Sequence, residues 1–216
     1  MNDETIEKNE SYWNEFYRNN FIQIPSQFCA LVSTYIEPRS TVIELGCGNG
    51  RDSHFFSKAN FSVIGVDLSY EAIKVCKTSK DSTKDIQFFC GDISKKDVSQ
   101  EIQNLLVSKR LSGEVSFYSR FVMHSIDELQ EKSFMQGLND LMMPGDLVFF
   151  EYRSQEDETT KKIFENHYRR YINTDIFIKN LIDIVGVEIK YSITGRGMAM
   201  YKNEDPIVSR VIAQKK

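Results

Sequence analysis

The chain has 216 residues, of which 41% are hydrophobic and 27% are charged, and its formal net charge is −4. This length fits one α/β domain, and the acidic balance argues against a nucleic-acid-binding protein, which needs a basic surface. No apolar run approaches the roughly 20 residues that a membrane span requires, and the polar, acidic start of the chain argues against a signal peptide. We therefore expect a cytoplasmic protein without a membrane span.

Cysteine and histidine spacing gives no sign of a disulfide framework or a metal site. The four cysteines are isolated, with no C-x-x-C pair, so we expect reduced packing residues. None of the three histidines has metal-ligand spacing, and no metal is expected. The cysteines are Cys29, Cys47, Cys76 and Cys90.

Residues 1–40 are predicted to be helical. Four aromatic residues fall on one side of a first helix, and Pro25 suits the first turn of a second one. The aromatic residues are Tyr12, Trp13, Phe16 and Tyr17, and the second helix has an apolar stripe of Phe28, Leu31, Val32 and Tyr35.

From residue 41 onward, short apolar runs alternate with helical patterns. This alternation predicts a mostly parallel sheet with helices on both of its faces. Ser125 and Glu128 have the spacing of a capping box that opens the last of these helices, and Pro144-Gly145 ends it. The predicted strands are 41–45, 62–67, 86–90, 114–119 and 146–152, and the predicted helices are 52–59, 69–80, 98–108 and 127–141.

The pattern changes after residue 152. An acidic stretch over 154–160 precedes two helical segments, and two strand-like runs then flank a glycine turn. The helical segments are 161–171 and 174–185, the turn is 195–197, and the strands are 188–193 and 207–213.

The clearest functional pattern is a buried strand that runs into three glycines, followed by a helix. The sequence ELGCGNG covers residues 44–50, with glycines at 46, 48 and 50. Glycines allow a tight turn and a close approach of a ligand to the backbone. Alone, this pattern also fits an ordinary strand–helix turn.

Two neighbouring strands also end in groups suited to a nucleoside. The next strand ends at Asp67, whose carboxylate can accept hydrogen bonds from both ribose hydroxyls. A third strand is followed by Asp92 and Ile93, which suit an adenine amino group and the adenine ring. Because the carboxyl ends of parallel strands share one crevice, we expect these groups to converge.

The motifs ELGCGNG, VDLS and GDI resemble the first three motifs of class I S-adenosylmethionine (SAM)-dependent methyltransferases over about residues 41–93. The resemblance implies a Rossmann-like α/β fold, with a mostly parallel seven-stranded sheet, a reversed last strand and a helical N-terminal lid. NAD enzymes share the acidic second strand, but Arg51 stands where their G-x-G-x-x-G fingerprint has its third glycine.

The resemblance also implies one domain over 1–216, with a lid at 1–40, a cofactor-binding core at 41–153 and a substrate side at 154–216. SAM is the expected cofactor. Its expected binding residues are Tyr12, Trp13, Glu44, Gly46, Cys47, Gly48, Gly50, Asp67, Leu68, Asp92, Ile93, Ser119 and Arg120.

Cationic and imidazole groups are predicted around the acceptor end of this crevice. Arginine matches carboxylate or phosphate oxygens, so several arginines suggest a small anionic acceptor. Any one of them could instead form a solvated ion pair. The (N/D)-P-P-(Y/F) signature of nucleic-acid amino-methylating enzymes does not follow the fourth strand. The candidate catalytic residues are Arg120, His124, Arg153, His167 and Arg170; Arg51, Arg169 and Arg196 lie near the same end.

A further resemblance covers most of the chain. Segments such as GNGRDS at 48–53, HYRR at 167–170 and YKNEDP at 201–206 resemble bacterial methyltransferases of capsule and surface-polysaccharide pathways. This implies O-methylation of a phosphorylated, phosphoramidate-bearing, nucleotide-linked or glycosyl intermediate. Separately, we expect a monomer or homodimer. His124 would serve as base for a hydroxyl acceptor, whereas a phosphate needs none. The alternatives are a small-molecule S- or N-methyltransferase and a non-catalytic SAM-binding regulator.

Overall fold

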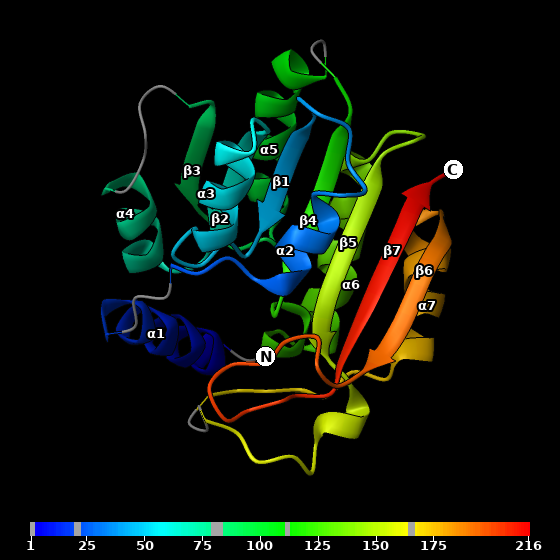
Figure 1. Ribbon diagram of the computed structural model, residues 1–216. Coiled ribbons are helices and arrows are strands. Elements are labelled where there is room, and N and C mark those ends of the chain that lie inside the picture. Colours follow the sequence, from blue (N-terminus) through cyan, green and yellow to red (C-terminus); the bar gives the residue numbers. More distant parts are fainter. Residues whose placement is uncertain (1–2, 20–22, 79–83, 111–112, 164–166) are drawn as a thin grey trace.

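The computed structural model describes residues 3–19, 23–78, 84–110, 113–163 and 167–216 (Figure 1). Seven strands form one sheet in the order β3-β2-β1-β4-β5-β7-β6. Strand β7 runs antiparallel to both of its neighbours, and the other pairings are parallel. The predicted sheet with its reversed last strand is therefore confirmed. The strands are β1 (Thr41–Leu45), β2 (Ser62–Asp67), β3 (Ile86–Cys90), β4 (Val115–Arg120), β5 (Leu147–Arg153), β6 (Val187–Gly195) and β7 (Val208–Lys215).

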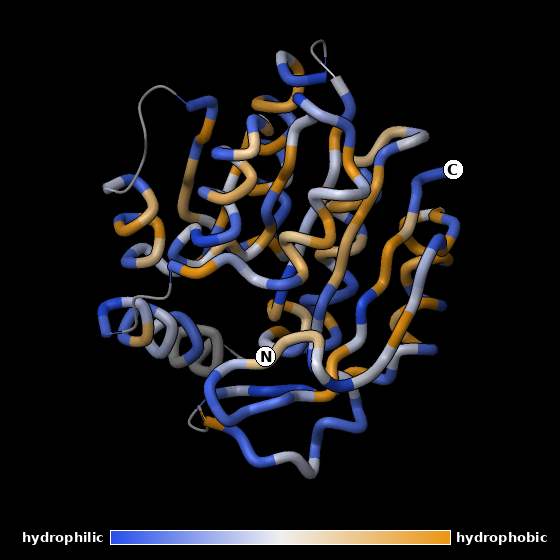
Figure 2. Tube along the Cα trace, in the orientation of Figure 1, coloured by the Kyte–Doolittle hydropathy of each residue, from blue (hydrophilic) through white to orange (hydrophobic). Residues whose placement is uncertain are grey.

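Helices cover both faces of the sheet, and the strands between them carry the apolar core (Figure 2). Every residue of β1 is buried, as expected for a central parallel strand with helices on both sides. One face packs against α2 (Gln27–Val32), α3 (Arg51–Lys58) and α4 (Tyr70–Thr78), and the other against α5 (Lys96–Lys109), α6 (Glu128–Leu141), α7 (Thr174–Asn180) and η3 (Leu181–Val185).

The parallel register brings the carboxyl ends of four strands to one edge. Leu45 pairs with Val66, and Asp67 with Cys90. The loops that follow β1 to β4 therefore start side by side at this edge. Two short helices, η1 (Met123–Ser125) and η2 (Gln155–Asp157), follow β4 and β5 there.

The N-terminal helix α1 (Asp3–Asn19) lies across this edge, beside α4 (Figure 1). The Asn14 side-chain oxygen accepts from the Ser69 hydroxyl at 2.8 Å and from the Glu71 backbone N–H at 3.2 Å. Arg18 forms an ion pair with Glu71 at 3.1 Å. These contacts hold α1 against the start of α4.

Three local expectations were wrong. The capping box of α6 uses Asp127 and Gln130, because Ser125 already belongs to η1. Pro25 precedes the N-cap residue Ser26 rather than starting α2. The described part of 161–171 contains no helix; Lys162 bonds to the carbonyls of Asp157 and Thr160, and Arg170 pairs with Glu131 on α6. Among the described residues, no helix is long and apolar enough to cross a membrane.

Candidate active site

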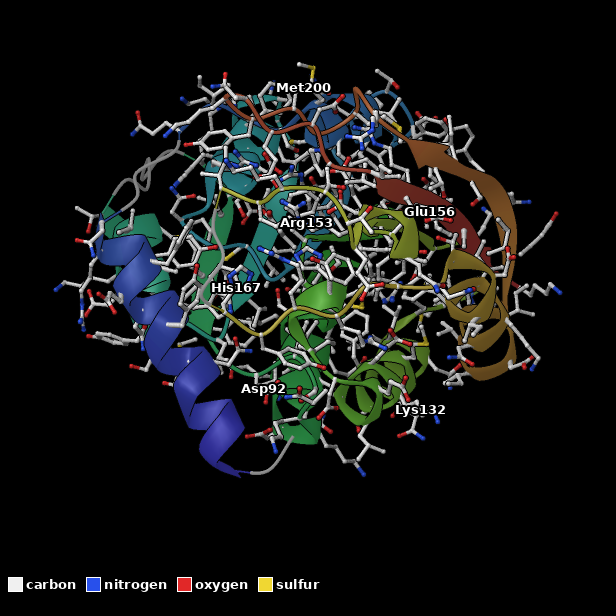
Figure 3. All side chains as sticks on the ribbon, turned by 90° about the horizontal axis from the view of Figure 1, so that it is seen from below. Asp92, Lys132, Arg153, Glu156, His167 and Met200 are labelled. Atoms are coloured by element: carbon white, nitrogen blue, oxygen red, sulfur yellow. The ribbon has the colours of Figure 1, made fainter. Side chains whose placement is uncertain are left out.

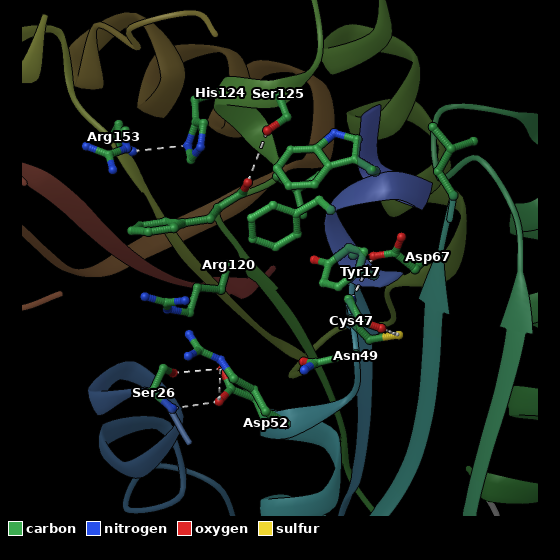
Figure 4. A pocket seen from close by; sticks show the side chains of 18 of the residues that line it. Tyr17, Ser26, Cys47, Asn49, Asp52, Asp67, Arg120, His124, Ser125 and Arg153 are labelled. Carbon is green, nitrogen blue, oxygen red and sulfur yellow. Dashed lines mark hydrogen bonds and ion pairs between the residues drawn. The ribbon is translucent and has the colours of Figure 1, made fainter. Parts of the chain in front are cut away.

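A cavity of about 620 Å³ opens at the carboxyl edge of the sheet, between the strand-end loops and α1 (Figure 4). Figure 3 looks onto this edge, where His167 and Arg153 lie near the centre, beside α1. The lining comes from α1, the glycine loop, the loops after β2 to β5 and the loop over 199–206.

The glycine loop forms a tight cradle at one end of the cavity. Gly46 and Gly48 have φ angles of 85° and 53°, a region that side-chain-bearing residues rarely adopt. A Cβ at Gly48 would lie 2.3 Å from the Tyr17 hydroxyl oxygen, so the aromatic face of α1 lies directly on this glycine. The absence of side chains at these glycines therefore lets Tyr17 and Val122 pack directly on the loop.

Behind the loop, Glu44 is buried and accepts from the Ser53 hydroxyl. Burial and the nearby Asp52 raise the pKa of Glu44 well above its usual range. Asp52 itself is bound by Ser26, whose N–H and hydroxyl both donate at 2.7 Å, and by the Tyr118 hydroxyl at 2.8 Å. This buried network fixes α2 and α3 against β4.

Asp67 holds the loop and faces the cavity. One of its carboxylate oxygens accepts from Gly48 N–H at 2.7 Å, and the other from Ser69 N–H at 2.9 Å. Burial raises the pKa of Asp67, although these two hydrogen bonds oppose the shift. The residue is 8% exposed and lines the cavity.

Asp92 lies farther along the same edge. Its Oδ1 accepts from the Ser94 N–H at 2.9 Å and from the Ser94 hydroxyl at 2.7 Å. Its second carboxylate oxygen has no hydrogen-bond partner among the described residues. Leu68 and Ile93 add apolar surface beside it. Two carboxylates and an apolar slot next to a glycine cradle match the ribose, adenine and amino-acid parts of SAM.

Aromatic residues of α1 cover the cavity, as the sequence pattern predicted. The Tyr12 ring stacks on His167 with centroids 4.8 Å apart, and Trp13 lies 5.2 Å from the same imidazole. Burial, with Asp67 nearby, raises the pKa of Tyr17 well above its usual range, so this phenol stays protonated. The sequence analysis did not name Tyr17 and Phe16 as binding residues, although their position on the same helical face was a usable signal.

Arg120 occupies the acceptor side of the cavity. Its Nε donates to one oxygen of buried Glu151 at 2.7 Å, and Arg210 Nε donates to the other at 2.7 Å. Two guanidinium groups share one carboxylate, so this cluster carries a net positive charge. The Arg120 Nη groups have no hydrogen-bond partner among the described residues, and Arg120 lines the cavity.

The Phe121 ring packs against the face of the Arg120 guanidinium. The ring centroid lies 4.1 Å from the Arg120 guanidinium carbon. The Phe121 φ angle is 60°, a strained conformation for a bulky residue that is held by a 2.8 Å hydrogen bond from its N–H to the Glu151 carbonyl. Strained backbone conformations are common at functional sites. The sequence contains no pattern that predicts this one.

The Arg153 guanidinium forms ion pairs with two carboxylates. It donates to Asp157 at 2.6 Å and also binds Glu204. Lys162 lies 3.3 Å from the same Asp157. Two cations and two anions balance, so this buried cluster ties the loop over 154–163 to the loop over 199–206. Arg153 lines the cavity but has little charge to offer a ligand.

Both predicted histidines line the cavity, and each has a fixed partner. His124 is 3% exposed, and its Nδ1 accepts from the Arg153 backbone N–H at 3.4 Å. The Arg169 guanidinium lies 3.1 Å from His167 Nε2, and His167 Nδ1 is buried without a hydrogen-bond partner. Burial and nearby arginines lower the pKa of His124 well below its usual range and that of His167 to about 4.

Three predicted site residues lie outside the cavity lining. Arg170 pairs with Glu131 on α6. Ser119 is 2% exposed and donates to the Leu45 carbonyl at 3.0 Å. Gly50 forms the left-handed N-cap of α3. Arg170 was misplaced because the helix predicted around it does not form.

The other predicted residues meet in one cavity, and several lining residues were missed. Asn9, Asn49, Gln130, Met200 and Tyr201 also line it. Asn49 and Tyr201 lie within the ELGCGNG and YKNEDP segments, which were usable signals, whereas Asn9, Gln130 and Met200 belong to no motif and only the fold could place them. The predicted residues in the lining are Tyr12, Trp13, Glu44, Gly46, Cys47, Gly48, Asp67, Leu68, Asp92, Ile93, Arg120, His124, Arg153 and His167. In the described part of the chain, no three His, Cys, Asp or Glu residues form a group that could hold a metal ion.

Comparison with known proteins agrees with this geometry. A family model described as a methyltransferase domain matches residues 36–175. A SAM-dependent methyltransferase structure from Anabaena variabilis aligns with a TM-score of 0.76 and 17% identity, covering 98% of this chain and 95% of that one. A SAM-dependent methyltransferase from Clostridium acetobutylicum aligns with a TM-score of 0.67 and 12% identity, covering 97% and 98%. A TehB-like SAM-dependent methyltransferase from Corynebacterium glutamicum aligns at 0.61 and 16% identity, covering 98% and 100%. No curated protein matches the sequence.

Proposed function

Since this chain belongs to the methyltransferase-domain family and is a SAM-dependent methyltransferase, we propose that it methylates an oxygen of a small anionic acceptor. The observation that carries the proposal is Arg120. It brings a net positive charge to the cavity, and its Nη groups are free to bind two oxygens.

SAM supplies an electrophilic methyl group on a sulfonium ion. Toward it, Asp67 and Asp92 would offer carboxylate oxygens for the ribose and adenine, and the Gly46–Gly48 backbone, which lines the cavity, would lie beside the amino-acid part. The protein then has to hold the acceptor oxygen in line with the methyl carbon at about 3 Å. Arg120 and the two histidines would position the acceptor.

The α1 helix would act as the lid of this site. Its aromatic face covers the glycine loop and stacks on His167, and Asn14 anchors it to the start of α4. Such a cover excludes water from the reaction and holds the ligands in place.

The capsule and surface-polysaccharide resemblance suggests where an anionic acceptor would come from. Phosphorylated, phosphoramidate-bearing and nucleotide-linked sugars are small anions that Arg120 could bind. The sequence resemblance and the charge of the cavity support this choice of acceptor. We further propose that the enzyme is a monomer or a homodimer.

Calorimetric titration with S-adenosylhomocysteine (SAH), followed by a melting-temperature screen on that complex, tests the proposal. We expect micromolar SAH binding and extra stabilisation by phosphorylated or nucleotide-linked sugars. Arg120→Gln should weaken anion binding roughly 10- to 100-fold, because hydrogen bonds to charged groups contribute about 1.5–3 kcal/mol. Lys202→Gln is the matched control, since it removes an exposed cation from the cavity rim.

Two outcomes would contradict the proposal. Stabilisation by neutral thiols or amines, without any response to anions, would favour a small-molecule S- or N-methyltransferase. SAH binding with anion binding but no methyl transfer to any bound anion would favour a SAM-binding regulator.

A further inference from the structure

The two cavity histidines have complementary, fixed proton positions. A guanidinium can only donate, so the Arg169 contact at 3.1 Å makes His167 Nε2 an acceptor. The proton of the neutral ring is then on Nδ1. This N–H is enclosed by protein atoms, has no hydrogen-bond partner among the described residues and is not open to a ligand in the cavity.

In His124 the roles of the two ring nitrogens are reversed. Its Nδ1 accepts from the Arg153 backbone N–H, so the neutral ring has its proton on Nε2. Nε2 makes no hydrogen bond to a described residue, and the ring lines the cavity. The charged groups that face His124 are Arg153, Arg169 and Arg120, with the His167 imidazole also near, and all of them disfavour a proton gain.

The His167 surroundings act in the same direction. Arg169 and Arg153 are the charged groups near it, and the rings of Tyr12 and Trp13 cover it from α1. Both imidazoles are therefore neutral donors near pH 7. Neither ring offers a free nitrogen lone pair to the acceptor.

The carboxylates of the cavity are also occupied. Asp52 accepts three hydrogen bonds, from Ser26 N–H, the Ser26 hydroxyl and the Tyr118 hydroxyl. Glu204 accepts from Arg153 and from the Ile163 N–H at 3.0 Å. Asp67 and Asp92 stand at the cofactor end, and Glu44 lies behind the loop. On the acceptor side the described groups offer hydrogen-bond donors and no free base.

We infer that His124 holds the acceptor by donating a hydrogen bond from Nε2, and that the methylated oxygen carries its own negative charge, as in a phosphate, phosphoramidate or carboxylate. The inference rests on the proposed function and narrows its acceptor. The acceptor oxygen forms its bond to the methyl carbon as the carbon–sulfur bond breaks, with that electron pair left on sulfur. The anion becomes a neutral ester oxygen, and no proton has to leave. A hydroxyl acceptor would lose a proton, for which this site has no recipient.

Nitrogen-15 NMR of the histidine rings in the SAH complex tests the proton positions, and the chain has only three histidines to assign. From pH 6 to 8 we expect His124 as the Nε2–H form and His167 as the Nδ1–H form. His54→Gln, His124→Gln and His167→Asn spectra assign the signals. The opposite tautomer at either ring, or a titration midpoint between pH 6 and 8, overturns the inference.

Amide substitutions separate a donor from a base. Glutamine places an N–H near the position of histidine Nε2, and asparagine places one near Nδ1, but neither amide can act as a base near neutrality. With glucose 1-phosphate or phosphoramidate added to the SAH complex, His124→Gln should retain at least half of the wild-type melting-temperature shift. His124→Ala should lose most of this shift.

The outcomes that refute the proposed function differ from those that refute the donor role of His124. If glucose 1-phosphate, phosphoramidate and inorganic phosphate all fail to stabilise the wild-type complex, the anion site of the proposed function is refuted. If they stabilise it but His124→Gln behaves like His124→Ala, the donor role is refuted while the anion site stands. Methyl transfer to a neutral sugar hydroxyl that is lost in both His124 variants would establish a base instead.

Discussion

The Asp67→Asn substitution should weaken both the fold and the cofactor site. Each carboxylate oxygen of Asp67 accepts one backbone N–H, from Gly48 at 2.7 Å and from Ser69 at 2.9 Å. An asparagine has only one oxygen, so in either orientation one of these N–H groups faces an amide NH₂. A buried N–H is then left without an acceptor.

The expected magnitudes follow from this geometry. An unsatisfied buried donor costs about 1–3 kcal/mol of unfolding free energy. For a chain of this size that corresponds to a melting-temperature decrease of roughly 2–12 °C. The variant also loses a charged acceptor for the ribose hydroxyls, so SAH affinity should fall roughly 10- to 100-fold.

Asp92→Asn is the matched comparison. Its oxygen can keep the Ser94 contacts while the amide nitrogen takes the place of the unpartnered oxygen. We expect an SAH affinity lower by about tenfold, with an unchanged melting temperature. Calorimetry and thermal unfolding of both variants provide the measurement. Asp67→Asn with wild-type melting temperature and wild-type SAH affinity would refute this account of the loop.

Other predictions concern the loop, the loop-linking ion cluster and the histidines. Gly48→Ala should reduce SAH affinity at least about tenfold, because its Cβ meets Tyr17 at 2.3 Å, whereas Gly145→Ala, at a φ of 95° in open space, should cost about 1–2 kcal/mol of stability and leave calorimetric SAH binding unchanged. Glu204→Ala should lower unfolding free energy in denaturant titrations by about 3–5 kcal/mol, since it breaks a buried ion pair, while Asp183→Ala in an exposed pair should change it by less than about 1 kcal/mol; equal effects would contradict the role of the cluster. The pKa values of His124 and His167 are lowered in the folded state, so their contribution to stability is complete above about pH 6.5 and is lost as pH falls toward 4. The melting temperature should therefore fall between pH 7 and pH 5, and a His124→Gln/His167→Asn double variant that shows the same fall would exclude these two groups as its cause.

The sequence predicted the sheet because its strands are short apolar runs at regular spacing, buried on both faces. It predicted the cofactor end because those residues directly follow strand ends, where parallel register brings them together. Glycines 46 and 48, Asp67 and Asp92 all meet in the cavity for this reason.

The acceptor side was predictable only in part, since it depends on which partner each charged group finds. Sequence alone cannot show that Arg120 and Arg210 share Glu151. Because one carboxylate faces two guanidinium groups, the positive charge of Arg120 is only partly neutralised. Nor can the sequence show that Arg153 pairs with Glu204 and Arg170 with Glu131, both from distant segments. The segment 161–171 has a helical pattern, but in its described part Lys162 bonds to the nearby Asp157 carbonyl and Arg170 makes a tertiary contact with Glu131, and no helix forms.

The central claim, methylation of an anionic acceptor held by Arg120, is tested most directly by measuring SAH formation from SAM. The reaction is run with phosphorylated, phosphoramidate-bearing and nucleotide-linked sugars, and with their uncharged counterparts, using wild-type protein and Arg120→Gln. We predict turnover with at least one anion, no turnover with its uncharged counterpart, and a loss of at least about tenfold in the variant. Equal turnover of the charged and uncharged forms, or full activity of the variant, would contradict the claim.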